Sequence, residues 1–119
     1  MSNPLQHTLQ KATSCETRFD ALSRQLYATD ASIYEIKPRG VALPRTAREA
    51  AEALAVLNQE GVAATPRGAG TGLAGGALGD GVILDMARYN KRITEFSAEK
   101  RTVRVGAGVT LDQLNNYLK

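Results

Sequence analysis

Seven of the eleven glycines in this 119-residue chain lie in one stretch, TPRGAGTGLAGGALGDG, from Thr65 to Gly81. Each glycine loses more conformational freedom on folding than alanine does, which costs roughly 0.5 to 1 kcal/mol. Seven of them together oppose folding by a large part of the net stability of a small domain. We therefore expect that the fold or a ligand requires bare backbone at this place.

A glycine-rich loop has two common uses. Main-chain N–H groups that point into a concave loop bind phosphate oxygens, and glycine permits the close approach and the positive φ that this needs. The alternative is a flexible surface loop. Pro66 restrains the entry to the stretch, and Arg67 places a cation there. Leu73, Ala74 and Leu78 are unlike the polar residues of a flexible linker, so we favour an anion-binding loop.

Two well-known nucleotide motifs do not fit the stretch. Gly70, Gly72 and Gly75 match the spacing G-x-G-x-x-G, but that motif needs a helix directly after the glycines and an acidic residue about 20 positions further on. More glycines follow instead, and Asp85 comes too early. A Walker A loop is excluded because the chain contains no Gly-Lys pair. We expect the loop to join one strand to another.

The composition is that of a globular protein. Apolar residues make up 43% and charged residues 23% of the chain, which is typical of a soluble domain. No apolar run approaches the roughly 18 residues that suggest a membrane span, so we expect none. The first residues lack the apolar segment of a secretory signal, which predicts a cytoplasmic location.

Nucleic acids and metal ions are not expected as partners. The net charge of +3 is dispersed, aromatic residues make up only 5%, and tryptophan is absent, whereas nucleic-acid surfaces cluster basic and stacking side chains. Cys15 and His7 are the only residues of their types. This excludes an internal disulfide and a cysteine-cluster metal site, and we predict no metal site.

Apolar periodicity predicts a βαβ unit before the glycine-rich loop. Val41–Pro44 is a short apolar strand that ends at a proline. Thr46 and Glu49 have the spacing of a capping box, and Gly61 is the expected end of the helix that follows. Residues 62–65 form the second strand of the unit. The apolar stripe of the helix comprises Ala50, Leu54 and Leu57.

The rest of the chain is predicted as follows. Residues 1–40 form a helical and extended lead-in. It is helical after Asn3 and again over 20–27, where Leu22 and Leu26 share a face, and is extended chain or loop from there to Pro38. After the loop, the segments VILDM, RITEF and TVRVGAG are expected to be strands. A last helix begins at the capping-box pair Thr110 and Gln113 and reaches the end of the sequence without a capping residue, so we expect the native chain to continue. Leu111, Leu114 and Leu118 share one face of it.

The segment PRGAGTGLAGGA, residues 66–77, resembles the pyrophosphate loop of the PCMH-type FAD-binding domain, the vanillyl-alcohol oxidase family. Within that family it is similar to the branch that contains glycolate oxidase, D-lactate dehydrogenase and D-2-hydroxyglutarate dehydrogenase. Three other stretches agree with this likeness, which covers nearly all of residues 19–119. They are YATDASIYEIKPRGVALPRTAREA, GVILDMARYNKRI and VRVGAGVTLDQLNNYLK.

The resemblance implies a fold and a cofactor. The fold is α+β, with a small βαβ-based sheet and covering helices that form the first subdomain of a PCMH-type domain over residues 41–119. The cofactor is FAD, and Thr71 cannot form the covalent flavin link that histidine makes at this position in some relatives, so we expect non-covalent FAD. The residues around the diphosphate are Arg67, Gly68, Ala69, Gly70, Thr71 and Gly72, and those along the cofactor towards the flavin are Gly75, Gly76 and Ala77.

Several roles remain open at this point. Arg67 either makes a charge-assisted contact with the diphosphate or is a surface arginine paired with an acid, and we favour a supporting contact. Residues 106–108 either approach the cofactor or form a simple turn. Asp85 either ends a strand near the nucleotide or is a turn residue, and we favour the turn. Asp30 and Tyr34 are interpreted as packing residues at the domain edge.

The resemblance also implies an activity for the whole protein. It implies an FAD-dependent dehydrogenase that oxidises a D-2-hydroxy acid by hydride transfer to the flavin, with an electron acceptor that reoxidises it. The second subdomain and the substrate domain of that family are absent from this chain, so no catalytic residue is expected in it. The remaining part of the FAD domain is expected to pack on it. The alternative is a non-catalytic module that binds a nucleotide or phosphate, or an interaction domain.

Overall fold

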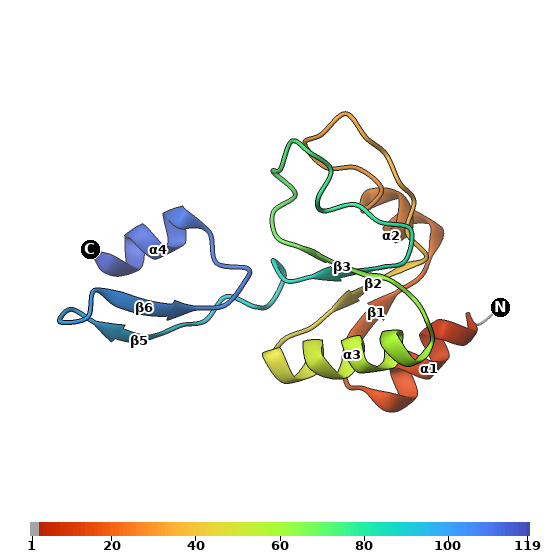
Figure 1. Cartoon of the computed structure of the whole chain (residues 1–119), viewed down its shortest axis with the longest axis horizontal. Coiled ribbons are helices and arrows are strands. Elements are labelled where there is room, and N and C mark those ends of the chain that lie inside the picture. Colours follow the sequence, from red (N-terminus) through yellow and green to blue (C-terminus); the bar gives the residue numbers. More distant parts are fainter. Residues whose placement is uncertain (1–2) are drawn as a thin grey trace.

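A four-stranded sheet forms the centre of the computed structural model, which describes residues 3–119 (Figure 1). Its strands are β1 (Glu16–Arg18), β2 (Gly40–Leu43), β3 (Ala64–Arg67) and β4 (Val82–Asp85). Their order in the sheet is β1-β2-β4-β3. Strands β2, β4 and β3 are parallel, and β1 pairs with β2 in the antiparallel sense. The α+β fold predicted from the sequence is thus present.

The predicted βαβ unit is present, but its two strands are not neighbours. Val41 of β2 and Thr65 of β3 both pair with Ile83 of β4, which lies between them. The segment VILD, which forms β4, is fully buried, and it pairs with a neighbouring strand on each side. Pro66 lacks the N–H that a central ladder needs, and β3 is an edge strand. This strand also runs over residues 64–67 rather than the predicted 62–65.

Two layers of side chains cover the two faces of the sheet. Helices α1 (Pro4–Ala12) and α3 (Ala47–Gln59) cover one face, where Leu9 and Leu57 pack with Leu84 in the main buried cluster (Figure 1). On the other face, Tyr27 and Tyr89 pack against a second cluster. That cluster comprises Val41, Leu43 and Ile83. The alternation along β2 and β4 follows from the two-residue period of a strand.

The buried stripe of α3 differs from the prediction. Ala50 and Leu57 are buried as expected, but Leu54 is 46% exposed and Ala53 takes its place in the core. The buried face of α3 is therefore centred about one residue earlier in the sequence than the spacing of Leu54 and Leu57 predicted. The capping box is also only half formed: Thr46 accepts the N–H of Glu49, whereas the Glu49 carboxylate accepts the N–H of Arg45.

The lead-in contributes a strand that the sequence pattern did not reveal. Strand β1 has no apolar alternation, and it lies between α1 and α2 (Ala21–Leu26). Asn3 caps α1 as predicted, and Asp20 caps α2. Leu22 and Leu26 are 69% and 63% exposed, so the face that they share is not the face that packs on the sheet.

An arm extends away from the sheet after β4 (Figure 1). It consists of β5 (Ile93–Ser97) and β6 (Thr102–Val105), two expected strands that pair as an antiparallel hairpin, followed by α4 (Leu111–Leu118). The capping box of Thr110 and Gln113 is complete. Helix α4 has no buried residue, so the apolar face predicted for it is open. Among residues 3–119, no helix has both the length and the apolar character to cross a membrane.

Candidate functional site

The glycine-rich stretch forms a loop between the carboxyl end of β3 and the amino end of β4. Residues 68–81 contain no helix or strand, which confirms the predicted connection of strand to strand. The loop lies beside the segment that follows α2 (Figure 1), where Ala31 donates its N–H to the carbonyl of Gly70 at 2.9 Å. The predicted site residues, 67–72 and 75–77, therefore all lie at the end of β3 and in the one loop that follows it.

The main-chain N–H groups of this loop are not used by the fold. From Gly68 to Gly76, no N–H donates to any group within residues 3–119. The first loop N–H with a main-chain partner is that of Leu78, which donates to Gly75 at 3.2 Å. Buried N–H groups are almost always paired, and exposed ones bind water or a ligand. The loop thus carries a continuous run of N–H groups that have no hydrogen-bond partner among the described residues.

Four of its glycines are explained by the fold itself. Gly70 and Gly75 have φ values of 70° and 79°, in the left-handed region where side chains are disfavoured. The backbone of Gly79 and Gly81 lies directly against β3, where an added Cβ would overlap a side chain or a carbonyl. The conformation and close packing of the loop require glycine at these positions.

Three other glycines are not explained in this way. Gly68, Gly72 and Gly76 have φ outside the left-handed region, and an added Cβ at each would meet nothing within 4 Å among residues 3–119. They are also exposed. Their bare backbone leaves open space along the same segment that carries the unpaired N–H groups. This arrangement fits an anionic ligand that approaches the main chain closely.

Arg67 is held beneath the loop rather than paired with an acid. Its guanidinium lies 5.2 Å from the ring centroid of Tyr27, and Nη1 contacts the Tyr27 carbonyl at 3.5 Å. Nη2 lies so close to Gly70 that an added Cβ would come within 2.8 Å of it. Within residues 3–119 no carboxylate forms an ion pair with Arg67, so the alternative of an acid-paired surface arginine is wrong.

A hydrogen bond connects Asp85 to Tyr27, the residue whose ring lies against Arg67. The Tyr27 hydroxyl donates to Oδ2 of Asp85 at 2.5 Å. Burial and this hydrogen bond raise the pKa of Tyr27 to about 12, so the hydroxyl remains a donor at neutral pH. Asp85 is the last residue of β4, and its Oδ1 accepts the N–H groups of Ala87 and Arg88 in the turn that follows, at 2.8 and 3.2 Å, so it both ends the strand and holds the turn. Sequence reasoning missed Tyr27, because its partner lies 58 residues away.

Asp30 and Tyr34 lie beside the glycine loop, and their packing role at the domain edge stays a prediction. Oδ1 of Asp30 accepts the hydroxyl and N–H of Ser32 at 2.5 and 2.8 Å, and these bonds lower the pKa of Asp30. Its Oδ2 is buried and has no hydrogen-bond partner within residues 3–119. The main chain of Ala77 in the loop also lowers the pKa of Asp30. An added Cβ at Gly75 would meet the Tyr34 ring at 3.0 Å.

Residues 106–108 form a turn against the segment after β4. Gly106 donates its N–H to Arg92 at 2.8 Å, and Gly108 donates to Asn90 at 2.9 Å. An added Cβ at either glycine would overlap main-chain atoms of residues 86–90. This supports the simple-turn interpretation of these glycines.

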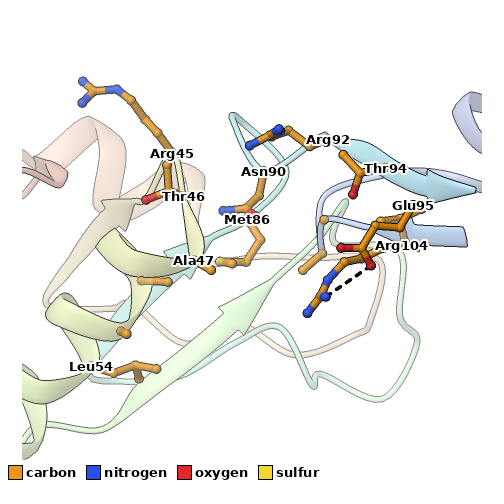
Figure 2. Close-up of a pocket in the computed structure, with 15 residues that line it drawn as sticks. Arg45, Thr46, Ala47, Leu54, Met86, Asn90, Arg92, Thr94, Glu95 and Arg104 are labelled. Carbon is orange, nitrogen blue, oxygen red and sulfur yellow. Dashed lines mark hydrogen bonds and ion pairs between the residues drawn. The ribbon is translucent and has the colours of Figure 1, made fainter.

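A cleft lies between α3 and the arm (Figure 2) and encloses about 740 Å³. Its walls carry Leu54 and Met86 on one side and the ion pair of Arg104 with Glu95, 3.5 Å apart, on the other. None of residues 67–77 lines it. The cleft and the glycine loop are therefore separate features of the carboxyl side of the sheet.

Comparison with known proteins places this loop in a family. Residues 38–119 match the family described as FAD binding domain. The chain is 42% identical over 120 residues to D-2-hydroxyglutarate dehydrogenase of Escherichia coli (strain K12), a match that spans 98% of the chain and 12% of that enzyme. It is 42% identical over 80 residues to glycolate oxidase subunit GlcD of the same strain, which spans 66% of the chain and 16% of that relative.

The fold leads to the same family. The structure of wild-type Physcomitrella patens BBE-like 1 superposes with a TM-score of 0.81 at 27% sequence identity, over 98% of this chain and 26% of that one. The chain thus spans only a small part of the proteins that it matches. The family match contains the whole glycine loop, both strands beside it and the arm. The chain therefore belongs to the FAD binding domain family, of the PCMH type that its loop sequence resembles, and its cofactor is FAD.

Proposed function

We propose that the loop from Arg67 to Ala77 holds the diphosphate of FAD. The observation that carries this proposal is the run of unpaired N–H groups over Gly68–Gly76, since hydrogen bonds to charged phosphate oxygens are stronger than neutral ones. Gly68, Gly72 and Gly76 supply the open space that such a contact needs. The diphosphate lies against Arg67, Gly68, Ala69, Gly70, Thr71 and Gly72, and the cofactor continues along Gly75, Gly76 and Ala77.

The position of the loop in the sheet supports the same proposal. Ligands of open parallel sheets bind outside the carboxyl ends of the strands. Arg67 and Asp85 are paired residues at the carboxyl ends of β3 and β4, and the loop and the arm leave the sheet at these two points. FAD bound to the loop would thus lie on the side of the sheet from which the arm extends.

The FAD is held without a covalent bond. Thr71 is exposed, and its hydroxyl is suited to donate a hydrogen bond to a phosphate oxygen but not to attach to the flavin ring. The test is release of FAD from the acid-precipitated protein. All of the yellow flavin should appear in the supernatant, and flavin that stays with the precipitate would contradict this assignment.

The protein to which this chain contributes is a dehydrogenase of D-2-hydroxy acids. Bound FAD supplies the hydride acceptor, and the residues of this chain bind and orient it. The relatives named for D-2-hydroxyglutarate and glycolate oxidation support the substrate class. A further electron acceptor, a cytoplasmic location and the packing of the rest of the FAD domain on the open faces of the arm, such as that of α4, are parts of the same proposal.

The test uses the protein encoded by the complete reading frame that contains this chain. The purified protein should be yellow, and D-2-hydroxyglutarate, D-lactate or glycolate should bleach the flavin under anaerobic conditions. Yellow protein that none of these acids bleaches would overturn the substrate class only. A folded, colourless protein that does not take up FAD would instead support the alternative of a non-catalytic phosphate-binding or interaction module.

A further inference from the structure

We propose that Tyr27 is a positioning residue for the glycine loop. Its ring holds the Arg67 guanidinium beneath Gly70, and this support keeps the N–H groups of the loop in the arrangement that binds a diphosphate. The inference rests on the proposed function, because it assumes that this loop binds FAD. Tyr27 itself touches no part of the cofactor in this account and acts through Arg67.

The Tyr27 ring is fixed on two sides. It is half-buried and packs against the cluster of Val41, Leu43 and Ile83. Its hydroxyl donates to Asp85 at 2.5 Å, and the Asp85 carboxylate is itself held by two N–H groups of the following turn. The ring therefore forms a rigid platform at the carboxyl edge of the sheet.

Arg67 connects this platform to the loop. Its guanidinium lies 5.2 Å from the Tyr27 ring centroid, and its Nη2 fills the space next to Gly70. The carbonyl of Gly70 is fixed from the other side by the N–H of Ala31. Arginine that stacks on an aromatic ring shifts an equilibrium by roughly twofold to thirtyfold. Loss of the ring would therefore free Arg67 and remove the support of Gly70.

The positive charge of Arg67 also favours the binding of an anion at the loop. No carboxylate within residues 3–119 forms an ion pair with it. Asp30 is close enough for Arg67 to lower its pKa, but the Asp30 carboxylate is bonded to Ser32. A cation that is not neutralised by an ion pair therefore remains below the unpaired N–H groups, where it favours an anionic ligand.

Tyr89 provides a matched control. It packs against the same buried cluster as Tyr27, lies under the guanidinium groups of Arg45 and Arg88 at 5.6 and 5.7 Å, and donates its hydroxyl to Glu16 at 3.3 Å. It has the same kinds of contact as Tyr27 but contacts neither Arg67 nor the loop. If Tyr27 contributed only through packing, replacing either tyrosine by leucine should have a similar effect on FAD affinity.

The experiment measures FAD affinity and thermal stability of the apoprotein from the complete reading frame. The change in flavin fluorescence on binding gives the Kd for the wild type and for Tyr27→Leu, Tyr27→Phe and Tyr89→Leu. We expect Tyr27→Leu to bind FAD about tenfold more weakly. Tyr27→Phe keeps the ring under Arg67 and should stay within about threefold of the wild type. Tyr89→Leu should lower Tm but leave the FAD affinity unchanged.

A double-mutant cycle with Arg67→Gln tests whether Tyr27 acts through Arg67. Arg67→Gln should weaken FAD binding, and adding Tyr27→Leu to it should weaken binding no further, because the two effects share one path. Wild-type affinity in Tyr27→Leu or in Arg67→Gln, or equal weakening by Tyr89→Leu, would overturn the inference. If Tyr27→Leu does not fold, Tyr27→Phe decides, because FAD binding more than about threefold weaker in a variant that keeps the ring under Arg67 would overturn the inference. A wild-type protein that binds no FAD would overturn the proposed function instead.

Discussion

At the scale of single residues, the glycines of the loop separate into those that the fold requires and those that it does not. Gly72 belongs to the second group, since it has neither a left-handed φ nor a neighbour within 4 Å of an added Cβ. Gly72→Ala should therefore raise the stability of the apoprotein by up to about 1 kcal/mol, because alanine restricts the unfolded chain. The added methyl should weaken FAD binding about tenfold, as misplaced or lost contacts of this size do.

Gly61→Ala is the matched control for Gly72→Ala. Gly61 has a φ of 66° just after the end of α3 and faces open space; it precedes the amino end of β3, whereas the loop follows the carboxyl end of that strand. Alanine there should lower stability by about 1 kcal/mol and leave FAD affinity unchanged. Urea unfolding of the apoprotein and a fluorescence titration with FAD measure both quantities. Unchanged FAD affinity in Gly72→Ala would contradict the role assigned to this backbone.

The loop residues can be proposed from the sequence because they are adjacent in the chain. Gly70, Thr71 and Gly72 stand in a local pattern that no distant residue has to complete. Tyr27 contributes through a hydrogen bond to Asp85 and a stacking contact with Arg67, both of which span much of the chain. A contact of that kind leaves no periodicity or motif in one sequence, so only the folded structure reveals it.

At the scale of elements, the helices begin where their capping residues stand. Thr46 accepts the N–H of Glu49 at 3.1 Å at the start of α3, the helix that carries much of the core. Thr46→Ala should lower the free energy of unfolding by about 1 kcal/mol. Thr8→Ala inside α1 is the control, since alanine is the better helix former there and should not destabilise. Equal loss in both variants in urea unfolding would contradict the capping assignment.

Asp20 caps α2 and should make stability depend on pH. The N–H and hydroxyl of Ser23 hold the pKa of Asp20 below its usual value of 3.8. The folded state thus binds this proton less readily than the unfolded state, so the stabilisation is present above about pH 4 and is lost as the pH falls below it. Asp20→Asn retains an acceptor but not the titration. Urea unfolding between pH 3 and 7 should show a smaller acid loss in this variant, and an identical acid loss would count against this capping role.

Strand positions were predicted less completely than helices. Apolar runs identify β2 and β4, because both are buried along their whole length. The three residues of β1 carry no such pattern, since their place depends on pairing with β2. The position of β4 between β2 and β3 likewise depends on the assembled sheet. Pro66 is compatible with an edge position of β3, but it does not identify the strand that lies beside β3.

At the scale of the whole molecule, the chain has a packed body and an open arm. The buried clusters lie around the four-stranded sheet, whereas α4 buries no residue and Phe96 of the hairpin is 54% exposed. The sequence predicted the two strands and the helix of the arm but neither the pairing of the strands as a hairpin nor the separation of the arm from the body, because these depend on contacts between distant segments. The loop follows the carboxyl end of β3 and the arm follows that of β4, so the proposed cofactor site starts from the same edge of the sheet as the arm.

A crystal structure of the FAD-bound protein from the complete reading frame tests the central claim most directly. The decisive quantity is the distance from each main-chain nitrogen of Gly68–Gly76 to the nearest diphosphate oxygen. Several of these distances should lie between about 2.7 and 3.2 Å, the range of N–H···O hydrogen bonds. A diphosphate bound elsewhere, with these nitrogens still bonded only to water, would contradict the account.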